Sequence, residues 1–361
     1  MNIGVLTFHR AYNYGARLQC YALTCYLKSL GHDVKVIDYY PDYFKEEYAL
    51  IPFKRIVKAR LLTKFALLLE SLLFLPLKAI RRLRFDRFLS NLPLSERLSS
   101  SSKQYGEYDI VFVGSDQVWN KQLTGDSADP LYTGNVKHKG IKLVAYAAST
   151  NVNSTAVDTS FYQQVLGNFE RVSVREDVFC DICNKILPGC AITVVDPVLL
   201  LGRKEWETIA VKPKENNYLL VYTVPSNPSV MKLARMVAES RKLKIIELVP
   251  NIKYLYKNNA RQVAAPEEFV GYFLYASYIV TTSFHGTAFS INFEKQFSTI
   301  LLGSSVDDRS VSLLNKLSLE SRAVSCLSIA LPKSEIDYPK VKNRLDAIKN
   351  TSFQYIKESI N

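Results

Sequence analysis

The hydrophobic pattern of the chain alternates short apolar runs with longer segments in which apolar residues recur every three or four positions. Continuous apolar runs are typical of parallel strands covered by helices on both faces, and the longer period is typical of helices. We therefore predict alternating strands and helices, with helices over 15–33, 229–243 and 266–277. The predicted strands cover residues 2–8, 34–40, 109–116, 142–149, 171–177 and 192–200, and then 217–224, 244–250, 278–286 and 297–302.

Two successive series of this kind predict an α/β fold with two doubly wound domains that face each other across a cleft. The polar stretch 197–216 separates the series, so we expect residues 1–200 to form one domain and residues 201–361 a second that ends in a helix. No GxGxxG or GxxxxGK[ST] motif follows a predicted strand. The sequence therefore signals neither dinucleotide nor P-loop nucleotide binding.

The net charge of +12 is concentrated in a basic insertion at 50–92. Between Lys54 and Leu92 stand ten Lys and Arg against two acids, and ten minus two gives +8. The apolar run 65–77 within it is too short to span a bilayer, which needs about 20 residues. No nucleic-acid recognition motif accompanies the charge, so we expect no nucleic-acid partner.

Two interpretations of this insertion remain open. It could be a helical hairpin that contacts an anionic membrane, or it could pack on its own domain or cover the cleft as a lid. In the membrane interpretation a row of arginines faces the headgroups, namely Arg81, Arg82, Arg84 and Arg87. A second row enters the acyl boundary, namely Leu67, Leu68, Leu72 and Phe74.

The N-terminus lacks the basic and apolar regions of a secretion signal, so we expect a cytoplasmic protein. Its six cysteines are then expected to be reduced. Cys180 and Cys183 form a CxxC, but no second pair completes a four-ligand set. We expect no metal site.

Polar side chains follow five of the predicted strands, at the ends where open parallel sheets bind their ligands. Asn13 and Gly15 follow the first strand, and Arg175, Glu176 and Asp196 follow later ones. The other two groups are Ser115, Asp116, Gln117, Trp119 and Asn120, and Ser283, His285, Gly286 and Thr287. A cleft lined in this way predicts a small-molecule site.

Over residues 3–322 the chain resembles the polysaccharide pyruvyl transferase family. The resemblance rests on "NYGARLQCYAL", "VGSDQVWN", "YAAS", "SVRED", "DPVLL", "TTSFHGTAFSINFEKQF" and "DDRSVSLLNKLSLESR". It implies an enzyme that transfers the enolpyruvyl unit of phosphoenolpyruvate to a sugar of a cell-surface glycan precursor, ending as a pyruvate ketal. It also implies two Rossmann-like domains in a GT-B-like arrangement, no further cofactor, and acceptors carried on a polyprenyl lipid at the inner membrane face.

The resemblance also implies roles on the donor side. His285 would act as the general acid that protonates C3 of phosphoenolpyruvate, although it could instead only cap the turn. Arg175 and Arg309 would bind the donor's carboxylate or phosphate, although Arg175 could instead pair with a neighbouring acid. The remaining donor contacts would come from Ser283, Gly286 and Thr287. Some family members carry an arginine at the position of Ser283. If that arginine binds the donor's phosphate in them, another cation must replace it here.

Asp116 would act as the base toward a sugar hydroxyl. Trp119 offers a face on which a sugar ring could stack, although it could instead pack in the core. The other acceptor contacts would come from Asn13, Gly15, Ser115, Gln117 and Asn120. Two alternatives remain: a GT-B glycosyltransferase that uses a nucleotide sugar, and a non-catalytic glycan-binding relative.

Overall fold

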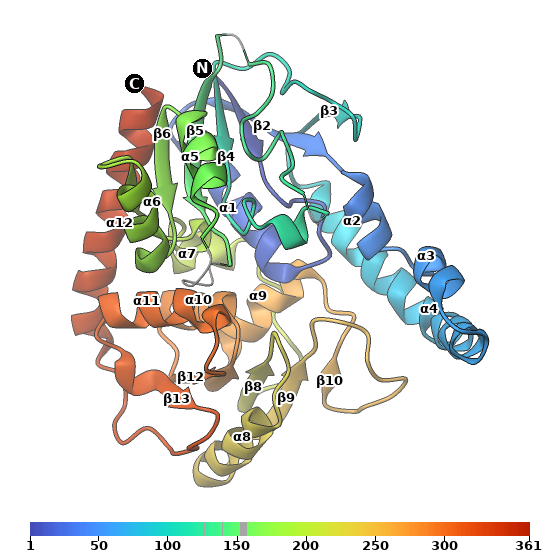
Figure 1. The fold of residues 1–361 in the computed structure, drawn as a ribbon. Helices are drawn as coiled ribbons and strands as arrows, with labels where there is room; N and C mark the ends of the chain where they lie inside the picture. The colour runs from blue at the N-terminus through green and yellow to red at the C-terminus, as the bar shows by residue number, and fades with distance from the viewer. Residues whose placement is uncertain (126, 139, 152–156) are drawn as a thin grey trace.

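The computed structural model describes residues 1–125, 127–138, 140–151 and 157–361 and contains two parallel sheets, one in each of two stacked units (Figure 1). The first sheet has the order β3 (Leu94–Leu98), β2 (Asp33–Tyr39), β1 (Asn2–Leu6), β4 (Ile110–Val113), β5 (Lys142–Ala148), β6 (Arg171–Val174) and β7 (Ala191–Thr193). The second has the order β10 (Ala260–Arg261), β9 (Lys244–Leu248), β8 (Tyr218–Tyr222), β11 (Tyr278–Thr281), β12 (Phe297–Leu301) and β13 (Ala323–Ser325). The predicted α/β fold with two doubly wound domains is confirmed.

Both sheets are wound in the same way. In each, the chain starts in the middle, moves outward to one edge, returns to the middle and moves outward to the other edge. The direction reverses between β1 and β4 in the first sheet and between β8 and β11 in the second. Ligands of doubly wound folds bind at such reversals, beyond the carboxyl ends of the strands. Two Rossmann-like units facing each other across a cleft form a GT-B-like arrangement.

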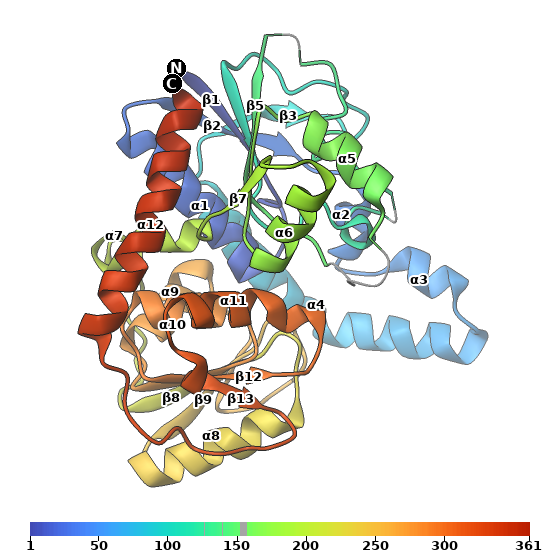
Figure 2. The same cartoon turned by 60° about the vertical axis from the view of Figure 1, so that its left-hand side comes forward.

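Helices cover the sheets and close the two units together. The helices are α1 (Tyr14–Ser29), α2 (Asp42–Glu47), α3 (Phe53–Lys58), α4 (Leu61–Leu89), α5 (Thr159–Gly167), α6 (Asp177–Ile186), α7 (Arg203–Glu207), α8 (Pro228–Arg241), α9 (Pro266–Tyr275), α10 (Phe284–Asn292), α11 (Asp308–Lys316) and α12 (Tyr338–Ile360). Helix α12 leaves the second unit and runs back along the first, so the two chain ends lie side by side (Figure 2). There the Tyr355 hydroxyl donates to the Ala145 carbonyl of β5 at 2.9 Å, and the Val195 amide donates to Ser352 Oγ at 2.9 Å.

The hydrophobic pattern does not predict three of the strands, β3, β10 and β13. Each lies at the edge of its sheet. Edge strands are short and partly exposed, so they do not carry the continuous apolar run that marks a strand buried on both faces. β3 has the sequence LSERL and no fully buried residue.

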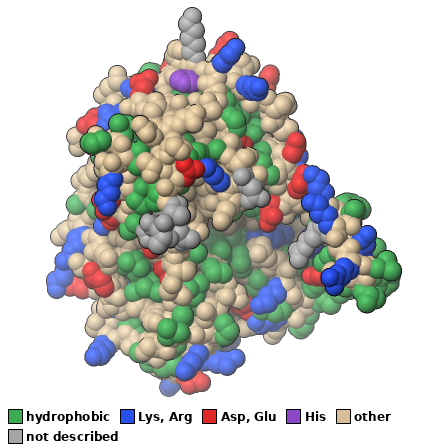
Figure 3. All heavy atoms as spheres, in the orientation of Figure 1, with side chains coloured by type: hydrophobic (Ala, Val, Ile, Leu, Met, Phe, Trp, Pro, Cys, Tyr) green, Lys and Arg blue, Asp and Glu red, His purple; other side chains and the backbone are tan. Residues whose placement is uncertain are grey.

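The basic insertion forms the α3–α4 hairpin, which projects from the body (Figures 1 and 3). The prediction that Arg81 faces lipid headgroups is wrong. Arg81 is buried, and its Nη1 donates to Tyr14 Oη at 2.8 Å and to the Gln262 carbonyl at 3.0 Å. Arg84 pairs with Glu268 at 2.7 Å. Both arginines therefore attach the base of α4 to the second unit. Within the described ranges, no helix combines the length and apolarity that crossing a membrane requires.

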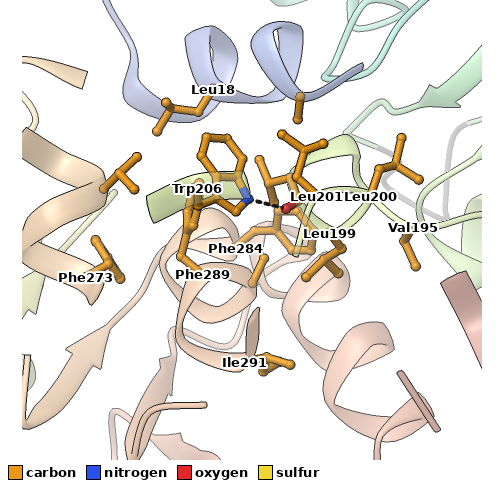
Figure 4. Close-up of a cluster of buried hydrophobic side chains, with 14 of the residues drawn as sticks. Leu18, Val195, Leu199, Leu200, Leu201, Trp206, Phe273, Phe284, Phe289 and Ile291 are labelled. Atoms are coloured by element: carbon orange, nitrogen blue, oxygen red, sulfur yellow. Dashed lines mark hydrogen bonds between the residues drawn. The ribbon is translucent and has the colours of Figure 1, made fainter. Parts of the chain in front are cut away.

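An apolar core joins the two units. Trp206 is fully buried in it, between Leu18 of α1 and Phe289 of α10, and its Nε1 donates to the Val198 carbonyl at 3.1 Å (Figure 4). Tyr14 makes a second contact between the units: its ring stacks on the ring of Phe269, with the two centroids 4.6 Å apart. Domains joined by a large apolar interface keep a defined relative position. The facing sheet ends are therefore held in place.

Candidate active site

A cavity of about 460 Å³ lies between the two units, at both reversals of strand order. Its wall includes Asn13 beyond β1, Asp116 beyond β4, Val224 beyond β8, and Ser283 and His285 beyond β11. These are the four strands that flank the two reversals. The position matches the binding crevice expected for each doubly wound unit, here shared between them.

His285 stands at the start of α10. The helix begins there because Ser283 is its N-cap, with Oγ accepting from the Gly286 amide at 3.4 Å. The imidazole is only 10% exposed, and its Nε2 lies 3.6 Å from Asp196 Oδ2. This distance exceeds a hydrogen bond, and Nε2 has no other partner in the described part of the chain. The side chain of His285, nine-tenths buried on the cavity wall, thus carries a buried ring nitrogen without a hydrogen bond.

Gly15 lets the imidazole approach α1. A Cβ atom placed on Gly15 would lie 2.1 Å from His285 Nδ1 and 2.4 Å from Cε1. Real side chains do not approach so closely, so any larger residue at position 15 would displace the ring or separate the two helices. The structure thus gives Gly15 a packing role against His285.

Asp196 connects several polar groups behind the imidazole. Its carboxylate accepts hydrogen bonds from Arg175 Nη1 at 2.6 Å, Ser115 Oγ at 3.3 Å and the Val198 amide at 3.0 Å. Burial alone would raise the pKa of Asp196, but the charges of His285 and Arg175 and these hydrogen bonds outweigh it and hold the pKa well below its usual range. Asp196 is therefore a buried anion beside His285 Nε2.

Arg175, predicted to bind the donor, lies behind the cavity. Its side chain is 1% exposed and pairs with Asp196 at 2.6 Å and with Asp116 at 3.5 Å. Burial alone would lower its pKa, but the charges of Asp196, Glu176 and Asp116 raise it above the usual value. With both terminal nitrogens occupied by carboxylates, Arg175 is placed to orient Asp116 and Asp196 rather than to grip an anion in the cavity.

Arg309 is the cation on the cavity wall. It lies in the first turn of α11, and no ion pair of its guanidinium occurs among the described residues. Burial and the nearby charge of Arg175 lower its pKa. The two guanidinium carbons lie 5.1 Å (Arg175) and 6.0 Å (Arg309) from the Phe284 ring centroid. The charges of Glu176, Asp116 and Asp196 offset part of the repulsion between the two guanidinium groups. An anion bound in the cavity beside Arg309 would offset more of it.

The two backbone amides predicted to bind the donor, those of Gly286 and Thr287, already donate hydrogen bonds within the protein. The Gly286 amide donates to Ser283 Oγ and the Thr287 amide to the Ser283 carbonyl at 2.9 Å. The N–H groups of Phe284 and His285, the first two residues of α10, have no acceptor in the described ranges. An anion at the start of α10 would meet these two amides and the positive end of the helix dipole.

The residues predicted for the acceptor side divide into two groups. Asn13, Asp116 and Gln117 line the cavity. Ser115 and Asn120 are buried behind it, where Ser115 holds Asp196 and Asn120 donates to Gln117 at 2.6 Å.

Trp119 does not face the cavity, so the prediction that a sugar ring stacks on it is wrong. It is 1% exposed, packs with Phe169 and Phe179 in the core of the first unit, and donates to the Tyr132 carbonyl at 3.0 Å.

An aromatic wall was not predicted. Tyr43, Phe44 and Glu47 of α2 and the following Tyr48 also line the cavity. Three aromatic residues within six positions are the signal in the sequence that could have identified this wall. In the described part of the chain, no three His, Cys, Asp or Glu side chains gather closely enough to hold a metal ion.

Comparison with known proteins gives one match to a family model, that of the polysaccharide pyruvyl transferases, over residues 13–302. This range includes His285, Asp116, Arg175 and Asp196 but ends before Arg309. No curated protein matches the chain in sequence.

Among solved structures, similar folds include two UDP-GlcNAc 2-epimerases. The enzyme from Neisseria meningitidis, bound to UDP-GlcNAc, has a TM-score of 0.45 and 10% identity over 99% of this chain and 94% of its own. The enzyme from Methanocaldococcus jannaschii has a TM-score of 0.44 and 8% identity over 97% of this chain and 93% of its own. At these identities the likeness concerns the fold alone.

Proposed function

The chain belongs to the polysaccharide pyruvyl transferase family, and from that premise we propose that it transfers the pyruvyl unit of phosphoenolpyruvate to a pair of sugar hydroxyls. The acceptor in this proposal is a precursor of a cell-surface polysaccharide, and the product is a cyclic pyruvate ketal. Because phosphoenolpyruvate is a metabolite of the cytoplasm, the proposal places the enzyme there. The observation that carries it is the position of His285 on a cavity wall beside the cation Arg309.

The proposed reaction forms two bonds at C2 of phosphoenolpyruvate, the first by addition and the second by displacement of phosphate. In the first, a sugar hydroxyl oxygen bonds to C2, and the proton that the hydroxyl loses balances the proton that C3 gains to become a methyl group. In the second, the bond from C2 to the phosphate oxygen breaks and a second hydroxyl oxygen bonds to C2. Inorganic phosphate leaves with the proton of that second hydroxyl.

The residues of the cavity suit these steps. His285 donates the proton to C3, and the buried carboxylate of Asp196, 3.6 Å from Nε2, stabilises the positive charge of the imidazole before transfer. Asp116 accepts the proton of the sugar hydroxyl. Arg309 and the first amides of α10 neutralise the carboxylate and phosphate of the donor. Arg309 thereby takes the place of the arginine that some relatives carry at Ser283.

Thermal unfolding with different donors tests the proposal. A ligand at a hundred times its Kd stabilises the folded protein by about 2.7 kcal/mol, which raises Tm measurably. We expect phosphoenolpyruvate to raise Tm. The anionic control is 2-phosphoglycerate, which lacks the enol. A rise in Tm with UDP-sugars and none with phosphoenolpyruvate would contradict the proposal and support a glycosyltransferase.

Replacing Arg309 with glutamine should raise the KM for phosphoenolpyruvate by about tenfold to a hundredfold. Loss of a charge-assisted hydrogen bond costs about 1.5–3 kcal/mol, which corresponds to that range. The matched control is Arg235→Gln on the exposed face of α8, which should leave KM unchanged. If the Arg309 variant instead weakens only acceptor binding, the assignment of Arg309 to the donor is wrong.

Replacing Gly15 with alanine should lower kcat about tenfold or more, because the added methyl group forces the His285 ring out of place. Gly167→Ala is the matched control, since a Cβ on Gly167 of α5 meets nothing within 4 Å. The comparison of kcat in the two variants, with circular dichroism to confirm folding, measures the effect. Equal kcat values would show that the close approach of Gly15 to His285 has no part in catalysis.

A further inference from the structure

The α3–α4 hairpin carries more apolar surface than its own packing uses. Near its C-terminal end, α4 packs on the body through Phe85, Phe88 and Leu89, all buried. Phe65 precedes Phe85 by twenty residues, which is about five and a half helical turns, so the two rings leave the helix on opposite sides. The side that carries Phe65 faces away from the body.

On that side the apolar residues form a continuous stripe. Its largest members are Leu61, Leu62, Phe65, Leu69, Leu72 and Leu73, which are 51–88% exposed. Their spacing of three, four and seven positions places them along one face of the helix. Phe53 and Val57 of α3, 66% and 68% exposed, extend the surface toward the hairpin tip. A contiguous exposed apolar surface of this kind marks an interaction site.

The charge around the stripe indicates what covers it. Lys58, Arg60 and Lys64 lie at or next to the turn between α3 and α4, while Lys54 pairs with Glu46 of α2. Glu70 is the one acid between Lys54 and Phe85. Two copies of so basic a hairpin would repel each other, which disfavours a dimer through this surface. A partner that fits both features must offer negative charge at its surface for the cations and an apolar layer beneath it for the stripe. An anionic lipid bilayer has these two properties.

We propose that the α3–α4 hairpin docks on an anionic membrane. The apolar stripe enters the boundary between headgroups and acyl chains, and the lysines and Arg60 contact the headgroups. The hairpin extends beyond both units (Figures 2 and 3), so the stripe can lie on a flat surface without interference from the body.

The hairpin is also held in a fixed position relative to the cavity. Arg81 and Arg84 attach its base to the second unit. Lys78 and Arg82 line a smaller cavity of about 190 Å³ at that base, and Tyr48 lines both this cavity and the main one. Docking would therefore hold the cavity near the membrane surface. On the proposed function, this would favour acceptors carried on a membrane lipid.

Flotation with lipid vesicles tests the proposal without any reference to catalysis. We expect the intact protein to float with phosphatidylcholine vesicles that contain phosphatidylglycerol, and to stay in solution with phosphatidylcholine alone. Raising the salt to about 1 M, where the Debye length is about 3 Å, should release it. Failure to bind the anionic vesicles at low salt would overturn the proposal and leave the proposed pyruvyl transfer unaffected.

Two triple variants with matched controls assign the contact to the hairpin. Leu62→Gln, Leu69→Gln and Leu73→Gln together should reduce vesicle binding at least tenfold, whereas the equally exposed control set should not. That control set is Leu187→Gln, Val211→Gln and Leu327→Gln. The second triple variant combines Lys58→Gln, Arg60→Gln and Lys64→Gln. It should also reduce vesicle binding, whereas a control variant that loses the same number of positive charges should not. That control is Lys137→Gln, Lys333→Gln and Lys342→Gln.

Two outcomes would count against the hairpin. Equal losses in a hairpin variant and its control would mean that binding reflects the net charge or general apolarity of the protein. A protein that sediments as a dimer, and becomes monomeric with the leucine variant, would mean that a second copy covers the stripe.

On a lipid-linked acceptor in vesicles both hairpin variants should slow the reaction, while turnover of a short water-soluble acceptor should not change.

Discussion

Replacing His285 with glutamine is expected to lower kcat by roughly two orders of magnitude or more, which is the usual effect of losing a general acid. Glutamine keeps a polar group of similar reach but cannot deliver a proton at neutral pH. The fold should survive, because His285 makes no hydrogen bond within the described residues that holds the structure together. Initial rates of phosphate release from phosphoenolpyruvate, with an acceptor present, measure the effect.

The chain offers a matched control for this change. His32 lies at the turn after α1, and His32→Gln should leave kcat unchanged. Reaction in heavy water adds a second readout, since the methyl group of the ketal should carry one deuterium delivered from the enzyme or solvent. A folded His285→Gln protein with near-normal kcat would remove His285 from the mechanism.

The central strands of both sheets could be predicted because they are buried on both faces. Every residue of β4, β8 and β11 is buried, so each forms a continuous apolar run in the sequence. The return of α12 to the first unit could not be predicted. The helix contacts Ala145 of β5 across 210 positions, and an amphipathic pattern indicates which face of a helix is buried but not its partner.

The site was predictable to the extent that strand ends determine it. The rule that ligands bind beyond parallel strands brings Asn13, Asp116, Ser283 and His285 to one place, and they do line one cavity. The same rule does not predict in which direction each side chain points. Trp119, only three positions after Asp116, points into the core.

The ion pairs between side chains of the site could not be predicted from the sequence either. Arg175 and Asp196 are 21 positions apart in sequence and 2.6 Å apart in space. This pairing removes Arg175 from the cavity wall and leaves Arg309 as the Lys or Arg side chain on that wall among the described residues. It depends on distances between the ends of β6 and β7 that no sequence pattern encodes.

Replacing Asp196 with asparagine is expected to have a large effect on stability as well as on activity. Removing one partner of a buried ion pair leaves the other charge uncompensated and costs about 3–5 kcal/mol. Here that charge belongs to Arg175, whose side chain is 1% exposed. Arg175 keeps its longer contacts with Asp116 at 3.5 Å and Glu176 at 3.9 Å, so we expect a loss toward the lower end of that range. Urea unfolding at neutral pH measures the loss. Asp158→Asn is the control, because Asp158 pairs with Lys121 at the surface, where an ion pair contributes little to stability.

The pH dependence of this loss separates charge from packing. Because the native-state pKa of Asp196 lies below that of the unfolded chain, about 3.9, the carboxylate stabilises the fold at every pH above that value. The stabilisation declines as the pH falls toward the native-state pKa, where the carboxyl becomes neutral like the asparagine. The difference between the original protein and Asp196→Asn should therefore be constant from about pH 5 to 7 and shrink below about pH 4. A difference that stays the same at low pH would mean that asparagine disturbs the packing around Arg175, and that the charge of Asp196 contributes little.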